Sequence, residues 1–225
     1  MSSPETVKVV LLGQAGVGKT CIITKFITGE FNPDQMTSLS AQYISKQMTF
    51  NDKVIKFDIW DTAGQERFRA LAKIFYKDAK VICLCYDITS KESFEELKDY
   101  WYEKQTKLNA NGDPIFAVVA NKNDLYQRQQ VQDDEGRAFA KSINAIFQST
   151  SAKSDSGITS LFENIGKRYF DPNFDSNAEE NKEKLEYEKK KTEKAQKRAQ
   201  PQPQSRGVKL DTSKTNSSQK KKGCC

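Results

Sequence analysis

Eight residues near the start of the chain have the types and spacing of a phosphate-binding loop. They are Gly13-Gln14-Ala15-Gly16-Val17-Gly18-Lys19-Thr20, directly after an apolar run from 7 to 12. Glycines adopt positive φ cheaply and carry no Cβ, so backbone N–H groups can surround an oxyanion at the positive end of the next helix. We expect Lys19 to reach the β and γ phosphates of a nucleotide and the Thr20 hydroxyl to bind Mg²⁺. A simple glycine-rich turn is the alternative.

A second group of candidate residues begins at Asp61, directly after the apolar run from 53 to 60. The segment is Asp61-Thr62-Ala63-Gly64-Gln65-Glu66, with a carboxylate where a strand should end and a glycine three residues later. Such a carboxylate is well placed to support a metal ion bound to phosphate. Taken alone, this D-x-x-G pattern is common and mostly forms a turn.

Two later motifs predict a base-binding site. Each follows an apolar run, and they are Asn121-Lys122-Asn123-Asp124 and Thr150-Ser151-Ala152-Lys153. The Asp124 carboxylate can accept hydrogen bonds from the two adjacent N–H donors of guanine, a pair that adenine lacks. The backbone N–H of Ala152 can mark the guanine carbonyl. N-K-x-D alone also forms a capped turn before a helix. Here both motifs follow the glycine loop along the chain in this order, which favours a nucleotide site.

Apolar runs and helix-like segments alternate along the chain and must position these motifs. We expect strands at 7–12, 43–50, 53–60, 81–86, 115–120 and 145–149, and helices at 19–28, 91–108, 133–142 and 158–169. This alternation indicates an α/β fold with a mostly parallel sheet covered on both faces and a ligand crevice at the carboxyl ends of the strands. Only Asn51-Asp52 separates the second and third runs, which predicts an antiparallel hairpin. The polar loop from 30 to 40 is long enough to carry function.

Length and composition exclude several kinds of catalysis. The 225 residues allow one α/β domain of about 170 residues and a tail, with a core that needs no disulfides. The sequence contains no histidine, which excludes Ser-His-Asp catalysis, histidine-bound metals and imidazole acid-base chemistry. Catalysis must then depend on positioning and charge. The five cysteines lack metal-ligand spacing and indicate reduced thiols; they are Cys21, Cys83, Cys85, Cys224 and Cys225.

The net charge of +6 is concentrated near the end of the chain. Residues 171–225 hold 14 Lys and Arg against 9 Asp and Glu, so the rest of the chain is close to neutral, at about +1. We therefore expect no nucleic-acid partner. The chain has no run of about 20 apolar residues, and residues 1–5 lack the features of a signal peptide, so we expect a protein made and kept in the cytosol.

The segment from 171 to 225 has the composition of a disordered tail. It is rich in Glu, Lys, Gln, Asn and Ser, and it cannot bury enough apolar surface to offset its ordering entropy. Residues 181–198 could extend the last helix, yet they are polar all round. Near the end, Lys220-Lys221-Lys222 precedes Gly223-Cys224-Cys225. Beside a lipid anchor, each lysine contributes about 1 kcal/mol to the free energy of binding to an anionic membrane. A run of charges without an anchor is typical of a solvated linker.

With these residues assembled, the region from 7 to 170 resembles a Rab, a small GTPase of the Ras superfamily, and resembles the endosomal Rabs more than the secretory ones. The resemblance rests on Ile59-Trp60-Asp61-Thr62-Ala63-Gly64-Gln65-Glu66-Arg67-Phe68, Tyr86-Asp87-Ile88-Thr89 and Gly223-Cys224-Cys225. It implies a P-loop G domain with a six-stranded sheet, five strands parallel and the first hairpin strand antiparallel. The implied organisation is an N-terminal extension at 1–6, a G domain at 7–170 and a hypervariable tail at 171–225 that ends in a prenylation motif.

The same resemblance implies roles for individual residues. Gln65 would be the catalytic residue that orients the attacking water, and the Mg²⁺ ligands would be Thr20, Ser38 and Asp61, the last acting through water. The implied phosphate-binding residues are Gly13, Gln14, Ala15, Gly16, Val17, Gly18, Lys19, Thr20, Cys21, Ser38 and Gly64. The implied guanine-binding residues are Phe31, which would stack on the base, and Asn121, Lys122, Asp124, Ser151, Ala152 and Lys153.

Two features bear on partner recognition. Rabs present an aromatic triad to effectors, and Tyr43, Trp60 and Phe75 stand at the matching places here; three ordinary hairpin and core aromatics are the alternative. Ser38 replaces the threonine that is usual in the switch loop, within Thr37-Ser38-Leu39-Ser40 rather than T-I-G. The Ser38 hydroxyl can still bind Mg²⁺, but Thr37 offers a rival hydroxyl one residue earlier.

The resemblance implies a GDP/GTP switch that slowly hydrolyses GTP with Mg²⁺ and recruits effectors in vesicle or endosomal trafficking. The implied partners are an exchange factor, a GTPase-activating protein, a Rab escort protein, a GDP-dissociation inhibitor, effectors, and a membrane reached through prenyl groups on Cys224 and Cys225. The expected location is the cytoplasmic face of intracellular membranes, with cycling through the cytosol. A guanine-nucleotide-binding module with little hydrolysis is the alternative, against which Gln65 argues. A nucleotide kinase would need an acceptor-binding lid that the sequence does not suggest.

Overall fold

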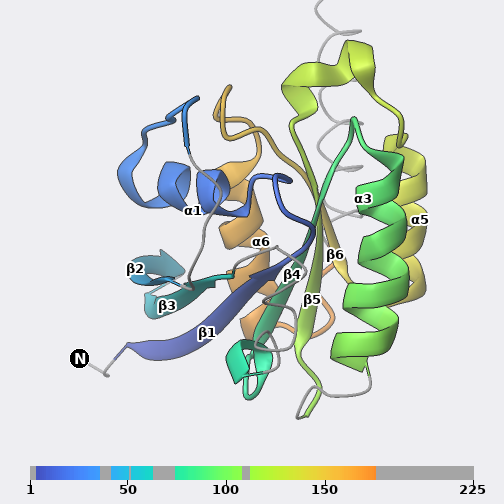
Figure 1. The fold of residues 1–225 in the computed structure, drawn as a ribbon. Coiled ribbons are helices and arrows are strands. Elements are labelled where there is room, and N and C mark those ends of the chain that lie inside the picture. Colours follow the sequence, from blue (N-terminus) through green and yellow to red (C-terminus); the bar gives the residue numbers. More distant parts are fainter. Residues whose placement is uncertain (1–3, 36–41, 51, 63–73, 108–111, 176–225) are drawn as a thin grey trace, which may run out of the picture. The chain divides into compact units, whose positions relative to one another are not determined.

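The computed structural model describes residues 4–35, 42–50, 52–62, 74–107 and 112–175 (Figure 1). The chain divides into two units, Met1–Lys182 and Glu183–Cys225, and the described residues all belong to the first. The predicted disordered tail lies outside the described residues from 176 onward. None of the helices in the described part is both long and apolar enough to span a membrane.

The described residues form a six-stranded sheet in the order β2-β3-β1-β4-β5-β6. Its strands are β1 (Glu5–Leu12), β2 (Gln42–Phe50), β3 (Lys53–Asp61), β4 (Val81–Asp87), β5 (Ile115–Asn121) and β6 (Ile146–Ser149). β2 runs antiparallel to β3, and the other neighbouring pairs are parallel, which confirms the predicted sheet. β1 begins at Glu5, which pairs with Ile55, so the last two residues of the predicted extension at 1–6 belong to the sheet.

Helices cover both faces of this sheet. They are α1 (Lys19–Thr28), α3 (Lys91–Glu96), the π-helix η2 (Leu97–Thr106), the short 3₁₀-helix η3 (Asn123–Arg128), α5 (Asp133–Ser142) and α6 (Ile158–Phe170). Figure 1 shows α1 and α6 on one face and α3 and α5 on the other.

Strand β4 explains why the central runs are almost entirely apolar. All of its residues are buried, and they alternate between two cores. Cys83 and Cys85 point into the core beneath α1 and α6, whereas Ile82 and Leu84 point into the core beneath α3 and α5. A strand that is covered on both faces needs apolar side chains at successive positions, which is what the sequence pattern indicated.

The helix predicted at 91–108 changes its geometry along its length. It is α-helical to Glu96 and continues as η2, in which the N–H of Lys107 bonds to the carbonyl of Tyr102, five residues earlier. Trp101 and Thr106 are both fully buried and are also five residues apart. One π-type turn places them on the same face. The sequence did not predict this change of register, because its apolar spacing up to Trp101 also fits an ordinary α-helix.

The parallel strands bring the predicted motifs to one edge of the sheet. The glycine loop follows β1, Asp61 ends β3, Asp87 ends β4, and Asn121 ends β5. Because β1, β3, β4 and β5 all run in the same direction, their carboxyl ends meet at the edge where ligands bind in open α/β sheets.

Candidate functional site

The loop between β1 and α1 is shaped by its glycines. A Cβ on Gly13 (φ 147°) would lie 2.2 Å from the carbonyl oxygen of Cys85, and one on Gly18 (φ 100°) would lie 2.3 Å from Nδ2 of Asn121. A side chain at either position would therefore collide with its neighbour. Gly16 (φ 81°) has nothing within 4 Å of an added Cβ, so the loop is open on that side. An open glycine-lined loop at a helix N-terminus fits a phosphate group.

Lys19 lies inside this loop. Its side chain is almost completely buried, and its ammonium donates hydrogen bonds to the carbonyl oxygens of Gly13 at 2.9 Å and Gln14 at 3.0 Å. Burial lowers the pKa of Lys19 below its ordinary value, and the nearby acidic groups of Cys85 and Asp61 oppose this effect. A buried cation held mainly by neutral carbonyls would be stabilised further by an anion such as phosphate.

Thr20 and Asp61 bring two oxygen ligands together beside the loop. The Thr20 hydroxyl donates a hydrogen bond to Oδ2 of Asp61 at 2.7 Å, which joins the first turn of α1 to the end of β3. The described part of the chain contains no group of three or more acidic, cysteine or histidine residues that could hold a metal by themselves. The Thr20 hydroxyl and the Asp61 carboxylate offer oxygen ligands of the kind that Mg²⁺ prefers, and Mg²⁺ commonly takes its other ligands from nucleotide phosphates and water.

Thr62 fixes the chain directly after Asp61. Its hydroxyl donates a buried hydrogen bond of 2.6 Å to the carbonyl oxygen of Leu11 in β1. This contact ties the backbone at the end of β3 to β1, directly before residues 63–73. Gly64 and Gln65 lie in that segment, outside the described residues.

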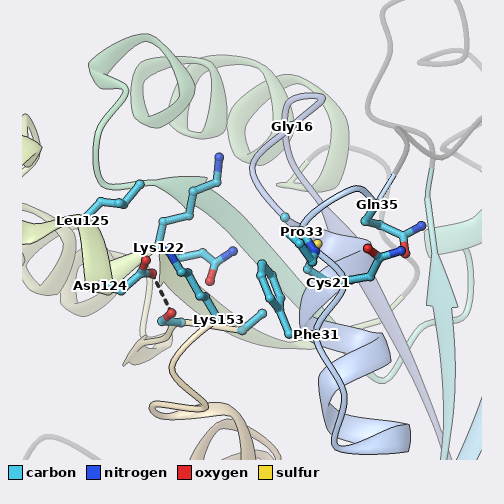
Figure 2. Close-up of a pocket in the computed structure, with 14 residues that line it drawn as sticks. Gly16, Cys21, Phe31, Pro33, Gln35, Lys122, Asp124, Leu125 and Lys153 are labelled. Atoms are coloured by element: carbon cyan, nitrogen blue, oxygen red, sulfur yellow. Dashed lines mark hydrogen bonds between the residues drawn. The ribbon is translucent and has the colours of Figure 1, made fainter.

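A pocket of about 280 Å³ adjoins the glycine loop (Figure 2). Its walls come from the glycine loop and α1, from residues 31–35, and from the two base-binding motifs. The lining residues are Gly16, Gly18, Cys21, Phe31, Asn32, Pro33, Gln35, Asn121, Lys122, Asp124, Leu125, Ser151, Ala152 and Lys153. Every residue that the sequence assigned to guanine binding therefore lies on this one pocket.

Asp124 is held in a defined orientation at this pocket. The hydroxyl of Ser151 donates a hydrogen bond of 2.6 Å to Oδ1 of Asp124, shown as a dashed line in Figure 2. The backbone N–H of Ser154 bonds in turn to the Ser151 hydroxyl oxygen at 3.1 Å. A carboxylate oriented in this way is ready to accept the paired N–H donors of guanine without first losing rotamer freedom.

Asn121 ties the base-binding motifs to the glycine loop. Its Nδ2 donates to the carbonyl oxygen of Val17 at 2.8 Å, and its Oδ1 accepts a hydrogen bond from the Thr150 hydroxyl at 3.1 Å. Asn121 is 2% exposed, and Thr150 is fully buried. One amide side chain thus fixes the spacing between three segments that are far apart in the sequence.

Some lining and supporting residues were missed by sequence reasoning. Asn32, Pro33, Gln35 and Leu125 line the pocket. Thr150, which the sequence placed in a base-binding motif without giving it a role, supports Asn121. The signal that could have identified these lining residues is their position in the sequence, because three of them closely follow Phe31 and Leu125 directly follows Asp124. Five predicted site residues lie outside the described residues, namely Ser38, Gly64, Gln65, Cys224 and Cys225.

The three aromatic residues predicted to meet effectors lie next to one another. The ring centroids are 5.3 Å apart for Tyr43 and Trp60 and 5.8 Å apart for Trp60 and Phe75. Tyr43 is 48% exposed, and the adjacent Ile74 is 67% exposed. These residues form one partly exposed apolar patch on β2, β3 and the segment that precedes β4. Exposed apolar patches are typical of protein-binding surfaces, and in this one Trp60 and Phe75 also pack against the core.

Comparison with known proteins gives a consistent result. The model of the Ras family matches residues 8–171 of the chain. Ras-related protein Rab-22A of Homo sapiens is 40% identical over 172 residues, which covers 76% of this chain and 86% of that protein.

Two further relatives have similar coverage. Ras-related protein Rab5A of Oryza sativa subsp. japonica is 37% identical over 161 residues, covering 72% of this chain and 78% of that protein. Ras-related protein Rab-21 of Homo sapiens is 39% identical over 161 residues, covering 72% of this chain and 71% of that protein.

Proposed function

Because the chain belongs to the Ras family and, within it, to the Rab-type small GTPases, we propose that its crevice binds GTP and GDP through the residues assigned above. Members of this family are GTP hydrolases that act as switches with Mg²⁺ and work with regulators and effectors in membrane trafficking, and the chain has this general role. The proposal concerns which residues carry it out.

The observation that carries the proposal is the position of Asn121. Its hydrogen bonds to Val17 and Thr150 unite the glycine loop with the two base-binding motifs around one pocket. In the proposed complex, Phe31 stacks on the base, Asp124 accepts from its N–H donors, and Lys19 and the loop N–H groups hold the phosphates. Bound Mg²⁺ would neutralise charge on the β and γ phosphates.

We propose that Gln65 orients the attacking water, and hydrolysis kinetics test this role. The purified protein should contain guanine nucleotide, and its single-turnover hydrolysis of GTP should be slow, on the order of 10⁻⁴ to 10⁻² per second without a partner's arginine. Gln65→Leu should slow hydrolysis further while leaving GTP affinity nearly unchanged, because positioning of the water is lost. An unchanged rate in that variant, with and without an activating protein, would remove Gln65 from the mechanism. Purified protein that retains no guanine nucleotide would contradict the function itself.

The finer assignments of partners and location are also proposals. We infer that an exchange factor, a GTPase-activating protein, a Rab escort protein and a GDP-dissociation inhibitor act on the chain, and that it works on the cytoplasmic face of endosomal or vesicle membranes. The resemblance supports geranylgeranyl groups on both Cys224 and Cys225, since two chains anchor stably where one is marginal. Mass spectrometry of the native protein should show two isoprenoid additions, and Cys224→Ser with Cys225→Ser should abolish membrane fractionation. Persistent membrane binding by that double variant would point to the lysines or to a partner instead.

A further inference from the structure

Asp87 ends β4 within the Tyr86-Asp87-Ile88-Thr89 block, which the proposed function leaves without a role. Its Oδ2 lies 2.7 Å from the Nζ of Lys122. Its Oδ1 accepts hydrogen bonds from the backbone N–H and the hydroxyl of Thr89, both at 2.8 Å. Both oxygens of the carboxylate are therefore engaged, and Thr89 fixes its orientation toward Lys122.

The two residues are joined through the sheet as well as through their side chains. Asp87 stands opposite Asn121 in the β4–β5 register, and the N–H of Ile88 bonds to the carbonyl oxygen of Asn121 at 3.1 Å. The side chains of Asp87 and Lys122 are 12% and 34% exposed. An ion pair that is partly shielded from water and built on two rigid strand ends is stronger than a pair on a flexible surface.

Lys122 lines the base pocket and is among the side chains drawn in Figure 2. Its backbone is left-handed, with φ of 65°, which fixes the direction in which the side chain leaves the main chain. A free lysine stem has several rotamers and loses that freedom when a ligand packs on it. If its ammonium is held beforehand, this loss does not weaken ligand binding.

We propose that Asp87 is a positioning residue for Lys122: it holds the lysine stem against the face of the guanine base and thereby slows nucleotide release. This inference rests on the proposed function, because contact of Lys122 with the base is part of that proposal. Asp87 does not itself line the pocket and, by this proposal, does not touch the nucleotide.

The test measures nucleotide release from the full chain loaded with a fluorescent GDP analogue in Mg²⁺, after addition of excess GDP. Asp87→Asn keeps the side-chain shape and can still accept from Thr89, but its amide presents N–H groups to the ammonium. Release should become about tenfold faster, the effect of losing one charge-assisted hydrogen bond. Thr89→Ala removes only the hydroxyl that donates to the Asp87 carboxylate, so it should accelerate release less than Asp87→Asn does. The matched control is Lys91→Met, which breaks the exposed Lys91–Glu135 ion pair nearby and should leave release unchanged.

A double-mutant cycle separates positioning from a structural role. Lys122→Met keeps an unbranched apolar stem and removes the ammonium, so Asp87→Asn should cause no further acceleration in that background. The inference would be overturned if Asp87→Asn released the nucleotide at the wild-type rate. It would also be overturned if Asp87→Asn accelerated release equally in chains with Lys122 and with Lys122→Met. A wild-type chain that fails to retain GDP would instead contradict the proposed function, so the two failures are distinguishable.

Discussion

Thr20 donates a hydrogen bond of 2.7 Å to Oδ2 of Asp61, although 41 positions separate the two residues. The bond joins the helix that follows the glycine loop to the strand that leads into residues 63–73. A metal ion bound between these two oxygens would therefore couple the phosphate-binding loop to the segment that contains Gln65. The first prediction tests this coupling.

Thr20→Ala should make nucleotide retention depend on much higher Mg²⁺ concentrations, because a metal ligand is lost while Lys19 and the loop N–H groups remain. We expect the Mg²⁺ concentration that half-maximally slows GDP release to rise by about tenfold or more. A hydrogen bond from a neutral group to a charged one is worth roughly 1.5 to 3 kcal/mol, and we expect the hydroxyl–Mg²⁺ contact to be at least as strong. Magnesium titration of GDP release measures this directly. Thr20→Ser keeps the hydroxyl and serves as the control. An unchanged titration in Thr20→Ala would remove the hydroxyl from the metal site.

Asp124→Asn should weaken the binding of guanine nucleotides by roughly 1 to 3 kcal/mol or more, because buried N–H donors on the base lose their acceptor. The new amide should favour xanthine nucleotides, whose pairing edge offers a carbonyl to it. Competition between GDP and xanthosine diphosphate for one fluorescent ligand would measure both changes. Asp155→Asn is the matched control, because its side chain is 59% exposed and pairs with Lys25 instead. Full affinity for GDP in Asp124→Asn would show that the specificity assignment is wrong.

The departure at Ser38 gives a prediction for the switch loop, which lies outside the described residues. Serine lacks the methyl group that restricts χ1 in threonine, so the loop should close less completely around the γ phosphate. Ser38→Thr should raise effector affinity in the GTP form, and Ser38→Ala should lower it and leave GDP binding alone. Phosphorus NMR of a GTP-analogue complex should show a perturbed γ phosphate in Ser38→Ala but not in Thr37→Ala. The opposite pattern would place the metal-binding hydroxyl at Thr37.

Cys21 gives a prediction for thiol chemistry at the pocket. Burial raises the pKa of the Cys21 thiol above its ordinary value, so at neutral pH its reactive thiolate is scarce. Alkylation by iodoacetamide should therefore be slow at pH 7 and should increase as the pH rises through that elevated pKa. Because Cys21 lines the pocket, GDP with Mg²⁺ should protect it.

Peptide mapping by mass spectrometry distinguishes Cys21 from the other thiols. Cys83 and Cys85 provide an internal control, because both are fully buried and burial raises the pKa of Cys85 to about 12. They should stay unmodified until the protein unfolds. Equal labelling of Cys21 with and without nucleotide would place the ligand away from this wall of the pocket.

The sequence determined most of the fold because local patterns report burial directly. The run from 81 to 86 is apolar on both faces, and it forms nearly all of the central strand β4, which is covered on both sides. The hairpin at residues 43–60 follows from two extended runs separated by two residues, and Gly29 ends α1 in the left-handed conformation that glycine allows. By contrast, the π-helix at Leu97–Thr106 depends on how Trp101 and Thr106 fit the core beneath them, and short apolar spacings do not distinguish the two kinds of turn.

The sequence also predicted the chemistry of the candidate site, since the glycine loop and Asp124 carry residue types that few other functions require at that spacing. Only the tertiary structure decided how the motifs support one another. Asn121 reaches Val17, Thr20 reaches Asp61, and Asp87 reaches Lys122. Each of these contacts joins two different elements or loops, so it depends on sheet order, on the register of neighbouring strands and on the rotamers that the packed core allows. Local sequence patterns carry no information on sheet order, register or rotamers. A sequence motif therefore identified Lys122 as a candidate residue, but only the folded sheet showed that Asp87 is its ion-pair partner.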